Sequence, residues 1–93
     1  MAETEIIRYH MIIHGSVQGV GFRYRARYAA EGLGITGWVK NCWDGTVEME
    51  AQGTKSRINE MLTLINRGSY IMIDGIETKQ IPVEEEERSF HLH

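Results

Sequence analysis

The spacing of the apolar residues changes several times along this chain, and the order of these changes limits the folds that it can adopt. Residues 6–14 are rich in β-favouring side chains and predict a strand. After a glycine-rich segment, apolar residues recur every three or four positions over residues 22–33, which predicts a helix with one apolar face. Gly32 and Gly34 predict the end of that helix. The chain therefore begins with a strand, a loop and a helix.

A two-stranded hairpin is predicted next. Residues 35–41 and residues 46–52 both alternate between two faces, which is typical of half-buried strands. Asp44 and Gly45 lie between the two stretches, and Asp-Gly is a strong signal for the tight turn of a hairpin. The two strands are therefore expected to be antiparallel neighbours.

A second helix is predicted after Gly53. Ser56 is a candidate for its N-cap, and Gly68 is a candidate for its end. Four apolar residues have the spacing of a single helix face, namely Ile58, Met61, Leu62 and Ile65. This face is expected to pack against a core.

The last third of the chain predicts strands. Residues 70–83 are strand-like with a bulge expected at Gly75, and residues 89–93 predict a short last strand. The acidic run at residues 84–87 is expected to be a solvated turn between them. In the order β-α-β-β-α-β, with one short extra strand, two helices must cover one face of an antiparallel sheet. The sequence therefore predicts an α+β fold, the ferredoxin-like α/β sandwich.

Length and composition favour one small domain that spans residues 1–93, because 93 residues are too few for two domains. The net charge of −3 counts against a nucleic-acid binder, which usually carries a basic excess. The single cysteine excludes an intramolecular disulfide, and no segment has the pattern of a signal peptide or a membrane span. These absences predict a cytoplasmic location without a membrane partner, and a monomer is expected as the default for a small domain with a polar surface.

The segment between the first strand and the first helix has the composition of an anion site. Glycines permit backbone conformations that direct successive N–H groups to one point, and the helix start adds unpaired N–H groups and a positive dipole end. The alternative is an ordinary turn, since a glycine-rich loop alone is a weak signal and this one lacks the Walker A ending. The candidate phosphate-binding residues are Gly15, Ser16, Val17, Gln18, Gly19, Val20, Gly21 and Phe22.

Arg23 follows this loop and falls in the first turn of the predicted helix. A cation there opposes the helix dipole and costs up to about 1 kcal/mol when nothing compensates. A bound phosphate reverses this effect, because the guanidinium, the amides and the dipole then all face one anion. The planar guanidinium also matches two phosphate oxygens. The position of Arg23 therefore indicates an anionic ligand.

Asn41 is a candidate for holding a water molecule. It shares a strand face with Ile35 and Val39, which are expected in the core. A polar amide at the end of an apolar row needs hydrogen-bond partners or an opening to solvent, and its donors and acceptor can orient a water molecule. The alternative is an asparagine that only begins the hairpin turn.

Two motifs of this chain resemble those of a known family. Residues 15–23 resemble the acylphosphatase signature Gly-x-Val-Gln-Gly-Val-Gly-aromatic-Arg. Residues 37–41, followed by Gly45, Val47 and Gly53, resemble the second signature of that family with the same spacing. Two independent motifs in the correct order make the resemblance specific.

The resemblance implies the ferredoxin-like fold and the hydrolysis of the carboxyl–phosphate bond of small acyl phosphates. It implies that Arg23 and the loop amides bind the phosphate and that Asn41 orients the attacking water. Neither a metal ion nor another cofactor is expected, and inorganic phosphate or sulfate is an expected ligand of the site. The match is strong over residues 13–53 and looser elsewhere. Residues 68–70 lack the proline that often follows the family's second helix, a departure that concerns the next strand and not the site.

Other side chains support weaker alternatives. Cys42 is a possible nucleophile, but strand alternation directs it away from Asn41. His91 and His93 have a spacing that permits metal binding, although a solvated edge is expected there. His14 precedes the loop and is expected to be a strand-end residue, with a charge near the phosphate as the alternative.

Two alternative functions belong to other classes. Arg8, Arg25 and Arg27, with Tyr24 and Tyr28, suggest an RNA-binding module, but the second hairpin strand lacks the aromatic residues on which such domains stack bases. A non-catalytic anion-binding or regulatory domain of the same fold is the other alternative, and the intact motifs argue against it. The sequence has no signature for the acyl group of the substrate.

Overall fold

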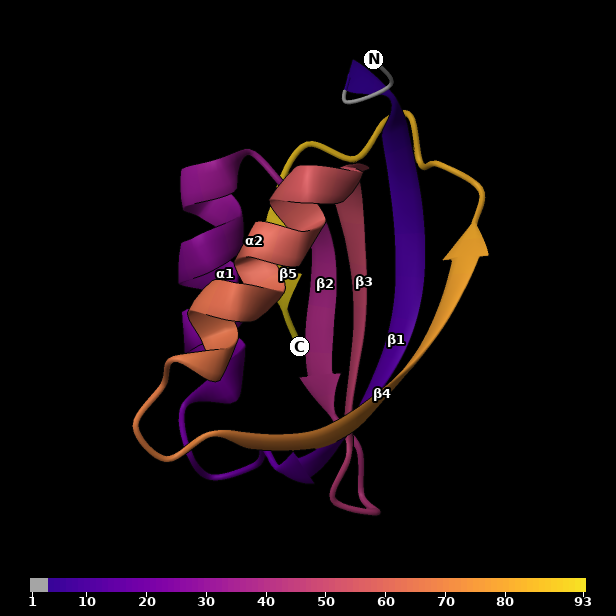
Figure 1. Ribbon diagram of the computed structural model, residues 1–93. Coiled ribbons are helices and arrows are strands. Elements are labelled where there is room, and N and C mark those ends of the chain that lie inside the picture. The colour runs from indigo at the N-terminus through magenta and orange to yellow at the C-terminus, as the bar shows by residue number, and fades with distance from the viewer. Residues whose placement is uncertain (1–3) are drawn as a thin grey trace.

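A computed structural model of the protein describes residues 4–93, which form two helices and five strands. Figure 1 shows both helices on one face of a single sheet. In chain order the elements are β1 (Ile6–Ser16), α1 (Phe22–Leu33), β2 (Thr36–Asn41), β3 (Val47–Thr54), α2 (Lys55–Asn66), β4 (Met72–Ile81) and β5 (Phe90–Leu92). Within the described residues, neither helix is long and apolar enough to cross a membrane.

The strand order of the sheet is β4-β1-β3-β2-β5. β1 pairs with β3 and β4, and β2 pairs with β3, all antiparallel. The predicted ferredoxin-like α+β fold is therefore confirmed. The sheet is mixed rather than entirely antiparallel, because β5 runs parallel to β2. This difference arises because the chain crosses from one edge of the sheet to the other before it forms β5.

The core lies between the sheet and the two helices. The predicted helical faces are confirmed, since each helix presents a row of buried residues to the sheet. The inward rows of β1, β2 and β3 complete the same cluster. The most fully buried members are Ile13, Ala26, Ala30, Val39, Val47, Met49, Ala51, Ile58, Met61 and Ile65.

The helix ends follow local capping chemistry. The predicted bounds of α1 are confirmed, with Gly34 in the left-handed conformation at its C-terminal end. Ser56 does not cap α2, so that prediction is wrong. Thr54 is the N-cap, because its hydroxyl oxygen accepts a hydrogen bond of 3.3 Å from the backbone N–H of Arg57. The extended backbone of Thr54 continues β3 directly into the helix.

The edge strand β4 is shorter than the predicted stretch of residues 70–83. His14 of β1 lies opposite Gly75, and Gly15 lies opposite Ile73, so Asp74 is an extra residue on β4. This is the bulge that was expected at Gly75. It lies beside the end of β1, where the chain leaves the sheet for the loop that precedes α1.

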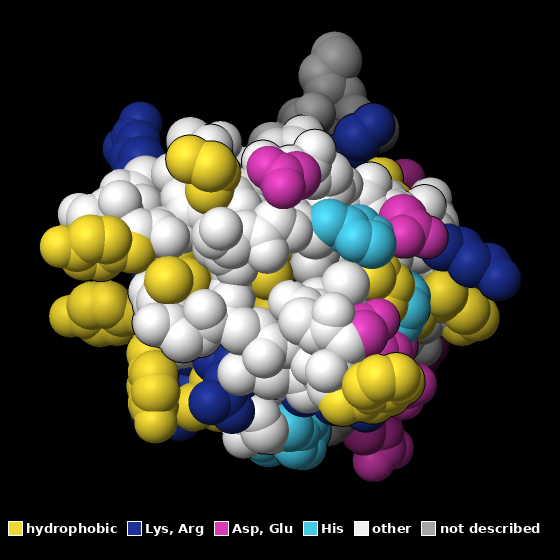
Figure 2. Space-filling model, turned by 90° about the horizontal axis from the view of Figure 1, so that it is seen from below, with side chains coloured by type: hydrophobic (Ala, Val, Ile, Leu, Met, Phe, Trp, Pro, Cys, Tyr) yellow, Lys and Arg dark blue, Asp and Glu magenta, His cyan; other side chains and the backbone are white. Residues whose placement is uncertain are grey.

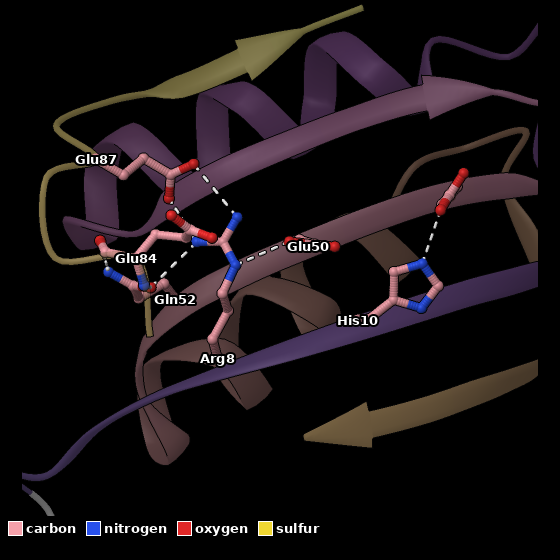
Figure 3. A network of polar contacts seen from close by, with 7 residues as sticks. Arg8, His10, Glu50, Gln52, Glu84 and Glu87 are labelled. Carbon is pink, nitrogen blue, oxygen red and sulfur yellow. Dashed lines mark hydrogen bonds and ion pairs between the residues drawn. The ribbon is translucent and has the colours of Figure 1, made fainter. Parts of the chain in front are cut away.

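Arg8 is buried on the side of the sheet that the helices leave open, with only 2% of its surface exposed. Its guanidinium donates hydrogen bonds to Glu50 (2.8 Å), Gln52 (3.1 Å) and Glu87 (2.7 Å), as Figure 3 shows. Gln52 also exchanges two hydrogen bonds with the backbone of Glu84. The acidic run is therefore only partly the solvated turn that was expected, because Glu87 is half-buried against Arg8.

Gly37 is required by close packing within the sheet. Its φ is +143°, and an added Cβ would lie 1.9 Å from the carbonyl oxygen of Glu50. We expect Gly37→Ala to lower the free energy of unfolding by about 2 kcal/mol, because the backbone must shift and strain is added. Urea denaturation measures the effect. The matched control is Gly32→Ala within α1, where an added Cβ would meet nothing within 4 Å beyond its chain neighbours and the nearby helix backbone. A gain of about 0.5–1 kcal/mol in the free energy of unfolding is expected there. Equal stabilities of the two variants would contradict this account.

Candidate active site

The loop of residues 17–21 lies at the end of the sheet where β1 stops and α1 begins (Figure 1). The tip of the β2–β3 hairpin lies at the same end. Gly19 and Gly21 have φ values of +71° and +81°, which few other residues adopt. These turns let the chain reverse direction within five residues and bring the motif residues close to the hairpin.

The start of α1 presents backbone N–H groups to this loop. Gly21 occupies the N-cap position in the left-handed conformation and has no side chain to cap the helix. The N–H of Arg25 donates to the carbonyl oxygen of Gly21 at 3.0 Å and closes the first turn. The N–H groups before Arg25 lie in the part of a helix that has no carbonyl partner within the helix. The site therefore has the donors and the dipole end that attract an anion.

A cavity of about 180 Å³ joins the two motifs. This volume is about six times the ≈ 30 Å³ that one water molecule occupies in the liquid, so a phosphate group fits with additional atoms. The lining contains no carboxylate, and its polar side chains are a guanidinium, an amide and a phenol. The lining residues are Val17, Gly19, Gly21, Phe22, Arg23, Tyr24 and Asn41.

Arg23 is half-buried at the edge of this cavity. One guanidinium nitrogen, Nη1, donates a hydrogen bond of 2.7 Å to the backbone oxygen of His93. This contact holds the side chain against the residue that follows β5, whose own N–H donates to Val39. Sequence reasoning missed the role of His93, because nothing in the local pattern joins two residues that lie 70 positions apart.

Asn41 is exposed at the end of β2 and lines the same cavity as Arg23. The face predicted for it is confirmed, since Ile35 and Val39 are buried earlier in the same row. The row leaves the core at the cavity, so the amide faces an opening to solvent instead of needing a buried partner. An amide in that position has free donor and acceptor capacity for a ligand or a water molecule.

Gln18 ties the loop to the hairpin. Its side-chain amide nitrogen donates to the carbonyl oxygens of Cys42 and Thr46, the latter at 2.8 Å. These two residues flank the hairpin turn, where the N–H of Cys42 also donates to Thr46 at 2.9 Å. Gln18 therefore fixes the distance between the loop and the strand that carries Asn41.

Four of the predicted loop residues do not line the cavity. Gly15 and Ser16 are the last residues of β1 and pair with β4. Val20 is half-buried and packs against the core. Gln18 bonds to the hairpin as described. These residues shape the loop, while Val17, Gly19, Gly21 and Phe22 form its cavity wall.

The weaker candidates lie elsewhere. His14 is 2.6 Å from a carboxylate oxygen of Glu77 on β4, on the side of the sheet away from the helices. Cys42 lies 4.0 Å from Glu48 on the outward row of β3. The rings of His91 and His93 are 6.4 Å apart, centre to centre. Across residues 4–93, no group of three or more His, Cys, Asp or Glu side chains is arranged to hold a metal ion.

The arginines that suggested RNA binding have other partners. Arg8 is buried, Arg25 donates to the backbone oxygen of Leu64 at 2.9 Å, and Arg27 pairs with Glu31 at 3.6 Å. They therefore do not form one basic surface of the kind that follows a nucleic-acid backbone.

A larger hollow of about 420 Å³ lies between the two helices. No residue of either motif lines it, and its volume alone does not identify it as a site. The cavity beside the loop is the better candidate, because it combines converging N–H groups, a guanidinium and an amide.

Glu48, on the outward face of β3, predicts a pH effect. The hydrogen bond with His10 (2.7 Å, Figure 3) lowers the pKa of Glu48 below its ordinary 4.5. Burial of the carboxylate offsets part of this shift, and the charge of Lys40 lowers the pKa further. The ionised carboxylate therefore stabilises the fold above pH 4.5, and this contribution is lost as the pH falls through the lowered pKa. We expect Glu48→Gln to be less stable than wild type by up to about 1 kcal/mol at pH 6 and nearly equal at pH 3.

Chemical denaturation at several pH values measures this difference. Glu60→Gln, an exposed glutamate on α2, is the control and is expected to show no such trend. A stability difference for Glu48→Gln that does not shrink on acidification would contradict the assignment.

Comparison with known proteins places this chain in one family. The family model described as acylphosphatase matches residues 9–92. A curated acylphosphatase from Clostridium acetobutylicum is 44% identical over 86 residues, which cover 91% of this chain and 94% of that protein. The solved structure of an acylphosphatase from Coxiella burnetii is 31% identical, with a TM-score of 0.85 over all of both chains.

A longer protein carries a similar unit. The crystal structure of full-length HypF in a phosphate- and nucleotide-bound form is 26% identical, with a TM-score of 0.80. The match covers 97% of this chain and 12% of that one.

The chain is an α+β protein of the ferredoxin-like type with a glycine-rich loop at the start of α1. Because the family model and the curated relatives cover most of the chain, it belongs to the acylphosphatase family. The resemblance drawn from the two motifs is thereby confirmed, and the chain is an enzyme of that family.

Proposed function

We propose that this protein hydrolyses the carboxyl–phosphate bond of small acyl phosphates by direct attack of water, with Arg23 holding the phosphate and Asn41 positioning the water. The observation that carries the proposal is that both side chains line one cavity with the glycine loop. The two residues come from separate motifs and lie 18 positions apart in the chain.

The phosphate binds at the start of α1 in this proposal. The N–H groups of the loop and of the first helical turn donate to its oxygens, and the guanidinium of Arg23 adds a charged fork. Inorganic phosphate and sulfate are expected to bind the same donors. These groups are fixed before the substrate arrives, so they stabilise the charge of the transition state without reorganisation.

The chemical step needs little acid assistance, because a carboxylate is a good leaving group. The oxygen of the water attacks phosphorus, the bond between phosphorus and the carboxylate oxygen breaks, and the electron pair leaves with the carboxylate. The proton of the water passes to a phosphate oxygen of the substrate. The products are a carboxylate and inorganic phosphate. Positioning and electrostatic stabilisation therefore supply the catalysis.

We also propose that residues 1–93 act as a single-domain monomer. The two side chains that the proposed reaction uses, Arg23 and Asn41, line one cavity of this chain.

Hydrolysis of benzoyl phosphate in the presence of EDTA tests the proposed reaction. We expect rapid release of benzoate and inorganic phosphate that the chelator does not slow. Absence of hydrolysis by folded protein that still binds inorganic phosphate would favour the non-catalytic anion-binding alternative.

Asn41→Ala tests the water-positioning role. We expect kcat for benzoyl phosphate to fall by about 10²-fold with little change in KM, because an interaction made in the transition state is removed. The matched control is Asn59→Ala, which removes an exposed amide on α2. An Asn41→Ala variant with wild-type kcat would remove this role from Asn41.

A further inference from the structure

One side chain of the cavity wall belongs to neither the phosphate-binding loop nor the pair of proposed catalytic residues. Tyr24 lines the cavity beside Arg23 and is 66% exposed. The other large apolar side chains of the wall, Val17 and Phe22, are 1% and 2% exposed and belong to the core. Val17 and Phe22 therefore line the side of the cavity that adjoins the core, and we call the solvent-exposed side lined by Tyr24 the mouth.

The position of Tyr24 in α1 explains why its ring reaches the cavity. It is the third residue of the helix, which begins at Phe22. Side chains in an α-helix lean toward the N-terminus, so a residue in the first turn projects back over the helix start. The cavity lies at that start. Arg23 and Tyr24 differ by about 100° around the helix axis, so they approach the cavity from different sides.

The orientation of an acyl phosphate in this site follows from its two ends. In the proposed function, the phosphate lies against the N–H groups of the loop and of the first helical turn. The acyl group then extends toward the mouth. Figure 2 shows this end of the molecule, where hydrophobic side chains lie mainly around the periphery of a largely uncharged centre.

The chemistry at the mouth favours an uncharged acyl group. The lining contains no carboxylate, and its only cation is Arg23, which is directed to the phosphate in the proposed function. An exposed aromatic ring offers a flat face that contacts another ring or an alkyl chain. The binding free energy from such contacts increases with the apolar area of the group.

We propose that Tyr24 forms the wall of an acyl-group subsite and that the enzyme favours aromatic and larger apolar acyl phosphates over acetyl phosphate. This inference rests on the proposed function, since the orientation of the acyl group depends on where the phosphate binds. Tyr24 is a specificity-determining residue and takes no part in the chemical step.

The experiment compares benzoyl phosphate with acetyl phosphate in Tyr24→Ala, Tyr24→Phe and wild type. We expect kcat/KM of Tyr24→Ala to fall about 3- to 10-fold more for benzoyl phosphate than for acetyl phosphate, and mainly through KM. Tyr24→Phe keeps the ring and is expected to retain the wild-type ratio. The matched control is Tyr28→Ala, which removes an 82% exposed tyrosine one turn further along α1, in the hollow between the helices.

A benzoyl-to-acetyl ratio of kcat/KM that stays within about twofold of wild type in Tyr24→Ala would overturn the proposal. The same holds if Tyr28→Ala changes the ratio as much as Tyr24→Ala. Circular dichroism and urea denaturation establish that the variants are folded, which is expected because both tyrosines are exposed on α1.

A binding measurement separates failure of this inference from failure of the proposed function. Calorimetry compares inorganic phosphate with benzylphosphonate, which carries the ring but is not hydrolysed. We expect Tyr24→Ala to raise the dissociation constant of benzylphosphonate about 3- to 10-fold more than that of phosphate. This preference tests the subsite even if the protein hydrolyses no acyl phosphate. If wild type binds neither ligand, both proposals fail.

Discussion

Arg23→Gln is expected to lower kcat/KM for benzoyl phosphate by about 10³-fold or more, because an arginine that stabilises the transition-state charge of phosphoryl transfer is worth at least that much. Both KM and kcat are expected to change, since the guanidinium contacts the phosphate before and during the reaction. The amide of glutamine keeps a hydrogen-bond donor but lacks the charge and the planar fork. Steady-state kinetics in EDTA measures the loss.

Two further variants separate binding from structure in this prediction. Arg23 also holds the backbone oxygen of His93, so its loss affects the end of β5 as well as the phosphate. Arg23→Lys keeps the charge and is expected to recover part of the activity, which a purely structural role for Arg23 does not predict. Arg27→Gln removes an exposed arginine on the same helix and is expected to leave kcat/KM unchanged. Activity of Arg23→Gln within tenfold of wild type would exclude the phosphate-binding role.

Arg8→Met is expected to lower the free energy of unfolding by about 3–5 kcal/mol, the range for removing one partner of a buried ion pair. The substitution leaves the carboxylates of Glu50 and Glu87, 18% and 14% exposed, without their cation. Burial alone lowers the pKa of Arg8, but its hydrogen bonds with these two carboxylates outweigh burial and raise the pKa. The charged form is therefore the one that the fold requires. Urea denaturation measures the effect.

The control is Arg27→Met, since Arg27 pairs with Glu31 at 3.6 Å on an exposed helix face. Exposed pairs contribute about 0.5 kcal/mol or less, so this variant is expected to be nearly as stable as wild type. Arg8→Lys keeps the charge but cannot contact both oxygens of Glu87, and it is expected to be intermediate. Equal stability of Arg8→Met and Arg27→Met would show that the buried network contributes nothing.

Features set by neighbouring residues were predictable from the sequence. The bounds of α1 follow from its apolar spacing and from Gly21 and Gly34, which both adopt left-handed conformations at its ends. The hairpin follows from Asp44 and Gly45, because the local chemistry of the turn needs no distant contact. The N-cap of α2 was misassigned, since Thr54 and Ser56 are both capping residues and β3 continues up to Thr54.

Features that depend on distant contacts could not be predicted in this way. The bonds of Arg8 to Glu87 and of Arg23 to His93 join residues 79 and 70 positions apart. The parallel pairing of β5 with β2 depends on the path of the chain across the sheet rather than on a local pattern. Tyr24 had no sequence signal as a cavity residue, because its position relative to the loop depends on the direction in which α1 leaves it.

The strand order also determines when each part of the molecule can be completed during folding. β1 is the first strand in the chain, but both of its partners, β3 and β4, come later, so it has no neighbour when it first emerges from the ribosome. Such non-local pairing slows folding relative to helical proteins of similar length. The contact of Arg23 with residue 93 forms later than these pairings, since residue 93 follows β5 in the chain. The active site is therefore expected to be complete only after the helices and the hairpin have formed.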